Sequence, residues 1–490
     1  MIRRISCLLA ILMFASALQA REEYTRDFDK NIPWKGQRLQ IDHSLGDVVV
    51  RGTPGSAVTI HAVIRVSAAS QDEARKFSGQ IGIQLDDSAP TIFIRTKYPE
   101  QHAFSGWRNV SYSVSYQIAA PPQAALQIRN SFGNVEAAGM KSGSDITNSH
   151  GRLVVRDGAG PHRLEDSFGP VQVSDSAGEV SVENSNGSVD VSNIRGPASV
   201  RDRFGNVTVT NVSGGVKVIN GNGSVRVTGA GGLSSITNSF GTVEASGIRG
   251  DLFINNSNGK IDAREITGAA ELNTTFGSIG FAGVGKGVTI RAGNSAITGS
   301  KTGGPITLQT SFGRVSLSEI RGGVRVVANN GDVILAGVGG EARVKTSFGL
   351  VDATDIKGSL IVENNNGGVK ARDVQGANVR TSFGPVLLER ADGPLDVVNQ
   401  NGAIDSSLTS QKSCRPVRLQ TSFGAVRLRI PANSNYQLTA RTSFGKINTS
   451  LPIKVSGTVG SDSLSGAIGQ GGCQLQVTNS NGSIDILSTQ

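Results

Sequence analysis

Aspartates recur at one phase of this sequence, a pattern that a carbohydrate-active enzyme on a parallel β-helix would show. Such enzymes place two carboxyl groups about 5–10 Å apart, one as proton donor and the other as nucleophile or base. Asp190, Asp262, Asp352 and Asp405 each follow a glycine turn at a similar distance. Catalytic sites on such arrays need projecting loops, and the spacing between residues 130 and 402 leaves no room for one. We therefore interpret these aspartates as outward, solvated strand positions and predict no catalytic residues.

Metal-binding and nucleophilic patterns are also missing from the sequence. No Cys-x-x-Cys, His-Glu-x-x-His or Gly-x-Ser-x-Gly motif occurs. Glycine clusters such as Gly229–Gly232 precede no helical pattern, so they indicate turns rather than phosphate loops. The histidines are scattered without metal-ligand spacing, at His43, His61, His102, His150 and His162. The sequence predicts no metal and no cofactor.

The residues that do recur are structural. A glycine slot repeats every 18 residues through thirteen consecutive steps from position 133 to position 367, with later spacings of 17, 18, 22, 21 and 37. An outlying copy, His43–Gly46, lies near the N-terminus. Equal spacing indicates a repeat array, in which each unit packs only on its neighbours.

The residue before the glycine alternates between two types. It is phenylalanine at Phe132, Phe168, Phe204, Phe240, Phe276, Phe312, Phe348, Phe383, Phe423 and Phe444. Between these, after His150, it is Asn186, Asn222, Asn258, Asn294, Asn330, Asn366 and Asn401, and Asn481 closes the series. Ten of the seventeen phenylalanines therefore occupy one repeat position, which we interpret as a structural corner.

Each unit reads as strand, turn, strand, turn, because valines alternate with polar residues on both sides of the glycine. An antiparallel meander also fits Asn-Gly turns, but it does not require constant spacing, whereas stacked coils do. A 36-residue coil would stack Phe on Phe, yet it would enclose a hollow wider than the ~10 Å that facing side chains fill. We predict an all-β protein, a single-chain β-solenoid (parallel β-helix-like) with 18-residue coils. Strand parity predicts that Phe168 points inward, on the face of Leu164 and Asp166.

The chain divides into three predicted regions. Residues 1–20 carry Arg3 and Arg4 before a short apolar run and small residues, which indicates a secretory signal peptide. Residues 21–125 lack the period and form an irregular β-rich cap, with a helix-start signal at Ser70–Glu73. Residues 126–490 form the solenoid. No later apolar run is long enough to span a membrane, so we expect export to the periplasm, the cell surface or the extracellular space.

Cys414 and Cys473 lie at similar repeat phases but about three coils apart by sequence. Three coils separate backbones by about 14 Å, whereas a disulfide needs Cα atoms within ~7 Å. Only the extra residues around Cys414, where the spacing stretches to 22, could close the gap. Whether the two cysteines pair remains open at this point.

The net charge of +9 is spread along the repeats, with no basic run or basic-aromatic interleaving. That distribution predicts no nucleic-acid partner. Attraction to an anionic surface polysaccharide, or binding to an envelope protein, fits an exported basic chain better.

The units Asn-Ser-Phe-Gly-Asn-Val, Asn-Ser-Asn-Gly-Ser-Val and Asn-Gly-Asp-Val resemble a bacterial putative-adhesin family of otherwise unknown function. The resemblance covers roughly residues 40 to 490 and implies a β-solenoid in the envelope or outside the cell. Its motifs are structural, so it carries over no functional residue. We expect a non-enzymatic structural or adhesion-type repeat protein. The alternatives are an envelope module for an anionic glycan or a protein partner and, third, a β-helix enzyme acting on polysaccharide.

Overall fold

The structure, a computed structural model, describes residues 21–99, 110–409, 414–456 and 460–489. The expected signal peptide, residues 1–20, lies outside the described residues. The chain forms two compact units, Met1–Ala159 and Gly160–Gln490. We describe each unit by itself.

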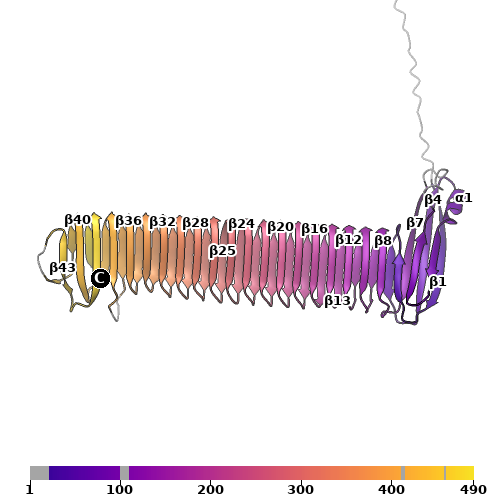
Figure 1. The fold of residues 1–490 in the computed structure, drawn as a ribbon, viewed down its shortest axis with the longest axis horizontal. Coiled ribbons are helices and arrows are strands. Elements are labelled where there is room, and N and C mark those ends of the chain that lie inside the picture. The colour runs from indigo at the N-terminus through magenta and orange to yellow at the C-terminus, as the bar shows by residue number, and fades with distance from the viewer. Residues whose placement is uncertain (1–20, 100–109, 410–413, 457–459, 490) are drawn as a thin grey trace, which may run out of the picture. The chain divides into compact units, whose positions relative to one another are not determined.

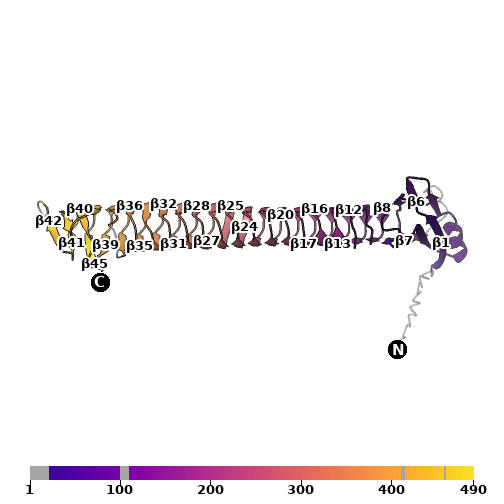
Figure 2. The ribbon, with the colours of Figure 1, turned by 90° about the horizontal axis from the view of Figure 1, so that it is seen from below.

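In the second unit, 18-residue coils stack with their strands parallel, and each coil contributes one strand to each of two facing sheets (Figures 1 and 2). The pairing Leu164↔Val182 and its equivalents show the 18-residue offset directly. The predicted solenoid with 18-residue coils is therefore confirmed. Neither the antiparallel meander nor the 36-residue coil describes this array.

The first sheet holds the strand that ends at the Phe or Asn position of each coil. Its strands are β12 (His162–Phe168), β14 (Val180–Asn186), β16 (Ala198–Phe204), β18 (Val216–Asn222), β20 (Ser234–Phe240), β22 (Leu252–Asn258), β26 (Ile306–Phe312), β28 (Val324–Asn330), β30 (Ala342–Phe348), β32 (Leu360–Asn366), β34 (Ala377–Phe383), β36 (Leu395–Asn401) and β38 (Val417–Phe423). Two longer strands, β24 (Ala270–Val284) and β25 (Val288–Thr302), continue through the corner and belong to both sheets.

The second sheet holds the strand that follows the glycine turn. Its strands are β13 (Val171–Ala177), β15 (Val189–Arg195), β17 (Val207–Val212), β19 (Val225–Ala230), β21 (Val243–Ile248), β23 (Ile261–Ile266), β27 (Val315–Ile320), β29 (Val333–Val338), β31 (Val351–Ile356), β33 (Val369–Val374), β35 (Val386–Ala391), β37 (Ile404–Leu408) and β39 (Val426–Pro431).

The interior between the sheets is filled by small and β-branched side chains. In the coil of β14 and β15, Val180, Val182, Val189, Val191 and Ile194 are all buried. The last two are three residues apart, so simple alternation would turn one of them outward. The intervening Asn193 has φ 55°, and this left-handed residue rotates the strand so that Ile194 returns to the core.

The C-terminal coils depart from chain order. The elements here are β40 (Tyr436–Phe444), β41 (Ile447–Thr449), β42 (Ile453–Val455), β43 (Ser463–Ile468), β44 (Cys473–Asn481) and β45 (Ile484–Thr489). Strand β44 pairs with both β38 and β40, and β45 pairs with both β39 and β41. The coil of β44 and β45 is therefore inserted between two earlier coils. Strand β43 lies antiparallel to β40 and covers the edge that β40 would otherwise expose.

This insertion accounts for the cysteines. Cys414 precedes β38 and Cys473 begins β44, and their Cα atoms lie 5.7 Å apart in a disulfide. The expected separation of three coils was wrong, because the inserted coil stacks directly on that of β38. The chain does not need to loop across the stack.

The first unit contains three coils and a cap. The coils are β2 (Arg38–Asp42) with β3 (Val48–Gly52), β8 (Leu126–Phe132) with β9 (Val135–Ala138), and β10 (Ser144–His150) with β11 (Leu153–Arg156). The outlying copy His43–Gly46 thus belongs to a genuine coil. The cap elements are β1 (Glu22–Pro33), β4 (Ala57–Ala68), α1 (Gln71–Ser78), β5 (Gly82–Asp86), β6 (Thr91–Lys97) and β7 (Ser111–Ala120).

The cap extends both sheets of the first coil. Strand β6 pairs with β2, and β7 pairs with β3, so the unpaired edge of that coil is covered. Beyond them, β5 pairs with β6, β4 with β7 and β1 with β4, all antiparallel. Helix α1 begins where the sequence predicts, with the Ser70 hydroxyl accepting from the Glu73 N–H at 3.3 Å. The cap is β-rich and irregular, as the sequence predicts, but the predicted region 21–125 also contains the first coil, formed by β2 and β3. A search of the described residues finds no helix that could serve as a membrane span.

Candidate functional site: the Phe–Asn edge

One edge of the coil stack in the second unit carries the alternating phenylalanines and asparagines, and we call it the Phe–Asn edge. It consists of Phe168, Asn186, Phe204, Asn222, Phe240, Asn258, Phe276, Asn294, Phe312, Asn330, Phe348, Asn366, Phe383, Asn401, Phe423, Asn481 and Phe444, in stacking order. Each residue lies at the corner where the chain leaves the first sheet, and each pairs with the next one in this series. Phe132 and His150 occupy the same position in the first unit.

The phenylalanines point outward, contrary to the sequence expectation. Those from Phe168 to Phe423 are 51–56% exposed, and Phe444 on the outermost coil is 76% exposed. The prediction from strand parity was wrong because the register passes from Asp166↔Asn184 directly to Phe168↔Asn186. Residue 167 has no register partner in the next coil, and the strand turns there. Asp166 is the last inward residue, and the ring beyond it emerges at the corner.

Glycine at the next position allows the corners to stack closely. Gly187 has φ 135°, and a Cβ atom there would lie 2.2 Å from the carbonyl oxygen of Gly169 in the preceding coil. A side chain at this position would therefore clash with neighbouring backbone. The turn keeps the side chain before the glycine, Phe or Asn, at the outer surface.

The side chains of the edge stack along the coil axis. In the first unit the rings of Phe132 and His150, on successive coils, are 4.6 Å apart and only 17° from parallel. The ring planes thus lie across the stack. In the second unit the Asn186 amide donates to the Ser167 carbonyl at 3.3 Å, and Asn481 donates to Ser422 at 3.3 Å. These bonds hold the amide against the preceding coil, beside its phenylalanine.

A largely polar row lies beneath the edge, two positions before each Phe or Asn, with Ala292 and Ala328 as its apolar members. The Asn220 amide donates to Asn238 Oδ1 at 3.1 Å, and Asn238 donates to Asn256 Oδ1 at 3.2 Å. Asn184 donates to the Gly187 carbonyl at 3.0 Å, while Thr310 donates to the Phe312 carbonyl at 3.2 Å.

Asp202 interrupts the buried row with an acid. Its side chain is 2% exposed, and neither carboxylate oxygen makes a hydrogen bond of normal geometry. Burial raises the pKa of Asp202 to about 6, although the nearby Arg203 N–H and Asn184 amide oppose the shift. The ionised carboxylate therefore destabilises the folded state at neutral pH.

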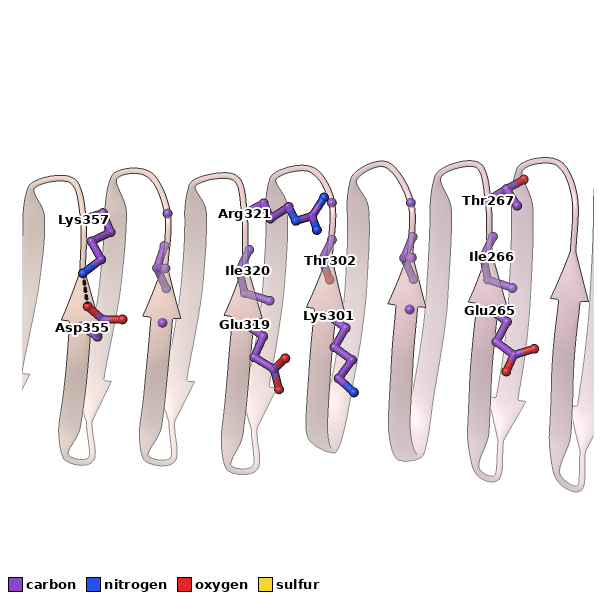
Figure 3. Close-up of a pocket in the computed structure, with 17 residues that line it drawn as sticks. Glu265, Ile266, Thr267, Lys301, Thr302, Glu319, Ile320, Arg321, Asp355 and Lys357 are labelled. Carbon is purple, nitrogen blue, oxygen red and sulfur yellow. Dashed lines mark ion pairs between the residues drawn. The ribbon is translucent and has the colours of Figure 1, made fainter.

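The opposite edge of the second unit carries a groove of about 920 Å³, shown in Figure 3. It follows the left-handed position of the second-sheet strands. Gly283 and Gly337 leave gaps there, and longer side chains on the neighbouring coils form the walls. Lys301 and Glu319 have φ 57° and 55°, a conformation that costs a residue of this type about 1–2 kcal/mol.

The charges of this groove balance. The acidic side chains are Glu265, Glu319 and Asp355, and the basic ones are Lys301, Arg321 and Lys357. Lys357 Nζ already forms an ion pair with Asp355 Oδ1 at 2.6 Å (Figure 3). The groove therefore offers no concentrated positive charge to an anionic polymer. Sequence reasoning missed it because the gaps arise from glycines at one phase of separate coils.

The four phased aspartates lie on the outer face of the second sheet, far from one another. Asp190 and Asp262 are four coils apart, about 19 Å at ~4.8 Å per coil. Asp262 pairs with Lys260 and Arg264 at 3.1 and 2.7 Å, and these cations hold its pKa below the usual value. The two carboxyl groups are too far apart to act together on one glycosidic bond.

The histidines also remain separate. In the first unit His43 Nδ1 lies 3.0 Å from Thr96 Oγ1, and burial lowers the pKa of His43 to about 4. His61 pairs with Asp29 at the surface, 2.7 Å away. His162 is buried at the start of β12, where burial lowers its pKa. In the part of the chain that the structure describes, which leaves out His102, no three His, Cys, Asp or Glu residues are grouped for metal binding.

Comparison with protein families gives a match over the C-terminal part of the chain. Residues 271–487 match the family Toastrack DUF4097. This segment covers β25 to β44 and parts of β24 and β45, which include the inserted coil and the edge from Phe276 onward. The toastrack match agrees with the predicted resemblance to a family of unknown function. No curated protein matches the chain.

Among solved structures, the chain is similar to a putative cell adhesion protein from Clostridium sporogenes. The identity is 11% and the TM-score 0.22, over 48% of this chain and 100% of that chain. This distant likeness carries no argument about function.

Proposed function

We propose that this chain is an exported, non-enzymatic repeat protein of the cell envelope or surface, and that it adheres through the Phe–Asn edge. One observation carries the proposal: nine phenylalanines, each at least half exposed, occupy a single position of the stack, with one asparagine between each pair. Exposed aromatic rows are uncommon on monomeric proteins and mark interaction sites. Aromatic side chains are also the usual anchors of binding surfaces.

Other features support the same reading. The disulfide between Cys414 and Cys473 suits an oxidising compartment outside the cytoplasm. The phased aspartates are separated, and both Asp262 and Asp405 are held in ion pairs with neighbouring cations, which argues against a glycan-cleaving site. The balanced charge of the groove argues against capture of an anionic polysaccharide there. Binding by the edge would instead rest on apolar contact, which salt does not weaken.

Adhesion of chain-coated beads to envelope preparations tests the proposal. We expect Phe240→Ser/Phe276→Ser/Phe312→Ser to reduce bead retention severalfold, and retention by the unchanged chain to persist in high salt. Phe253→Ser is the matched control, because Phe253 is 41% exposed but lies on the outer face of the first sheet. Equal retention by the triple variant, or loss of retention in salt alone, would contradict the proposed role of the edge.

A further inference from the structure

Along the Phe–Asn edge, phenylalanine rings recur at a constant spacing, with a shorter asparagine side chain between each pair. Successive phenylalanines are two coils apart, about 9.6 Å at ~4.8 Å per coil. Asparagine side chains are shorter than phenylalanine, so the outer part of each gap between rings is open. A second ring placed midway would lie about 4.8 Å from each neighbour, within the range of stacked aromatic pairs.

We propose that the partner of this edge is a second copy of the same chain, whose phenylalanines insert between those of the first. This inference rests on the proposed function and names its partner. A second copy has the required spacing by construction, because its rings also recur every two coils. Displacement by one coil places every ring of one copy opposite an asparagine of the other.

Ring orientation favours this partner over an extended polysaccharide. The Phe132 ring lies across the stack, parallel to the His150 ring on the next coil. The phenylalanines from Phe168 to Phe423 occupy the equivalent corner position and are exposed to nearly the same extent as Phe132, so we assign their rings the same orientation. A glycan lying along the edge would present its sugar faces parallel to the axis and would meet only ring edges. Rings of a second copy meet them face to face.

Phenylalanine and asparagine continue to alternate along the edge at the C-terminal coils, where the order of the stack differs from the order of the chain. Phe423 pairs with Asn481, and Asn481 pairs with Phe444, so the inserted coil restores the alternation at this end. The nine rings therefore span 16 coil steps, or about 77 Å. With an edge as wide as the ~10 Å between sheets, each copy would contribute about 770 Å². Stable interfaces bury ~800 Å² per partner.

The first-sheet flank of the edge is nearly free of charge. The residue before each Phe or Asn is Ser, Thr, Gly, Asn or Gln in every coil of the second unit except at Arg203. Such short or neutral residues allow two edges to approach without burying unpaired charges. The opposite edge, with Lys301, Glu319 and Arg321, lacks this property. On the other flank of the Phe–Asn edge, the position after the glycine carries Lys260, Arg314, Asp332 and Lys446, of which Arg314 and Asp332 pair with each other at 3.1 Å.

In this pairing, the two copies are related by a two-fold axis perpendicular to the coil axis. The coil axes of the two copies are therefore antiparallel. That arrangement is closed and isologous, so each edge contacts the same surface of its partner. A two-fold axis parallel to the coil axis would place rings opposite rings and prevent insertion. The antiparallel dimer therefore satisfies both symmetry and ring spacing.

Sedimentation of the purified chain over a concentration series, at low and high salt, tests the pairing. We expect a dimer that salt does not dissociate. Phe240→Ser/Phe276→Ser/Phe312→Ser should weaken it by about a hundredfold or more, since aromatic anchors each typically contribute about tenfold or more in affinity. Phe253→Ser should leave it unchanged. Circular dichroism and thermal melting confirm that each variant is folded.

A second variant separates ring insertion from general stickiness. Asn258→Phe/Asn294→Phe fills two gaps and adds apolar surface, yet ring insertion predicts that it weakens the dimer. A stronger dimer in this variant, an unchanged dimer in the triple serine variant, or a monomer at every concentration would overturn the inference. If the chain is monomeric but bead adhesion still depends on the Phe–Asn edge, the proposed function holds and this partner is wrong.

Discussion

Phe423 lies opposite Asn481 in the register of the neighbouring strand β44, although the next member of its row along the chain is Phe444. In the sequence, these two successive phenylalanines break the alternation. In space, Asn481 lies between them, because the coil of β44 and β45 inserts there. The alternation follows the order of the stack and not the order of the chain.

The outward position of the rings makes a direct prediction about stability. Phe240→Ala should lower the free energy of unfolding by no more than about 1 kcal/mol, because half of the ring is already exposed. Ile254→Ala, at a position only 1% exposed, should cost about 2–5 kcal/mol through the cavity it leaves. Urea unfolding of both variants checks the contrast. Equal losses would show that the Phe240 ring is part of the core.

Asp202 should make stability depend on pH. Its folded-state pKa is raised to about 6, against 3.8 unfolded, so the folded state binds the proton more tightly. Stability should therefore fall as pH rises from about 4 to 6 and stay reduced above that range. Asp202→Asn should remove this dependence and stabilise the coil at pH 7 by about 1 kcal/mol, because an amide continues the buried row. Amide hydrogen exchange across β16 at several pH values measures it, and an unchanged profile would contradict the assignment.

His43 should make the first unit sensitive to acid in the opposite sense. Burial lowers its folded-state pKa to about 4, so the unfolded chain binds the proton more tightly than the folded one. Stability should decline as pH falls from about 6.5 towards 4. His43→Gln should flatten this decline, as followed by hydrogen exchange in β2 and β7. His61→Gln, at an exposed ion pair, is the control and should leave the buried histidine's contribution in place.

The disulfide should hold the inserted coil in place. Cys414→Ser/Cys473→Ser removes a link that closes a loop between residues 59 apart. We expect a loss of about 2–4 kcal/mol, confined to the C-terminal coils because an array couples mainly neighbouring units. Hydrogen exchange should accelerate in β44 and β45 and not in β20. Uniform acceleration along the second unit would instead show that the array unfolds as one body.

The period and strand pattern were enough to predict the coil length, the two sheets and the buried valines. Those features follow from local alternation and from equal spacing, which a single sequence displays directly. Strand parity gave the wrong direction for Phe168, because the ladder skips residue 167 at the corner and parity holds only within a continuous strand. The Asn193 position shows the same effect in the second sheet. Both departures are properties of corners.

The inserted coil could not be predicted from spacing, which assumes that coils stack in chain order. The sequence did contain a signal, since Phe423 and Phe444 are consecutive members of the row, with no asparagine at the row position between them. Treating the alternation as a rule of spatial neighbours would have placed Asn481 between them and brought Cys473 next to Cys414. The groove needed more than this, because its gaps arise where Gly283 and Gly337 take the left-handed position that longer side chains hold in the neighbouring coils.

The coil of β44 and β45 also sets a limit on how this protein can be assembled as it emerges, residue by residue, from a ribosome or a translocation channel. From β12 to β39 each new coil can settle on the one just completed. At β40 this stepwise stacking must pause. The coil of β38 and β39 is covered by β44 and β45, which follow β40 and β41 in the chain and have not yet emerged. The far end of the stack is finished only when the last two strands arrive.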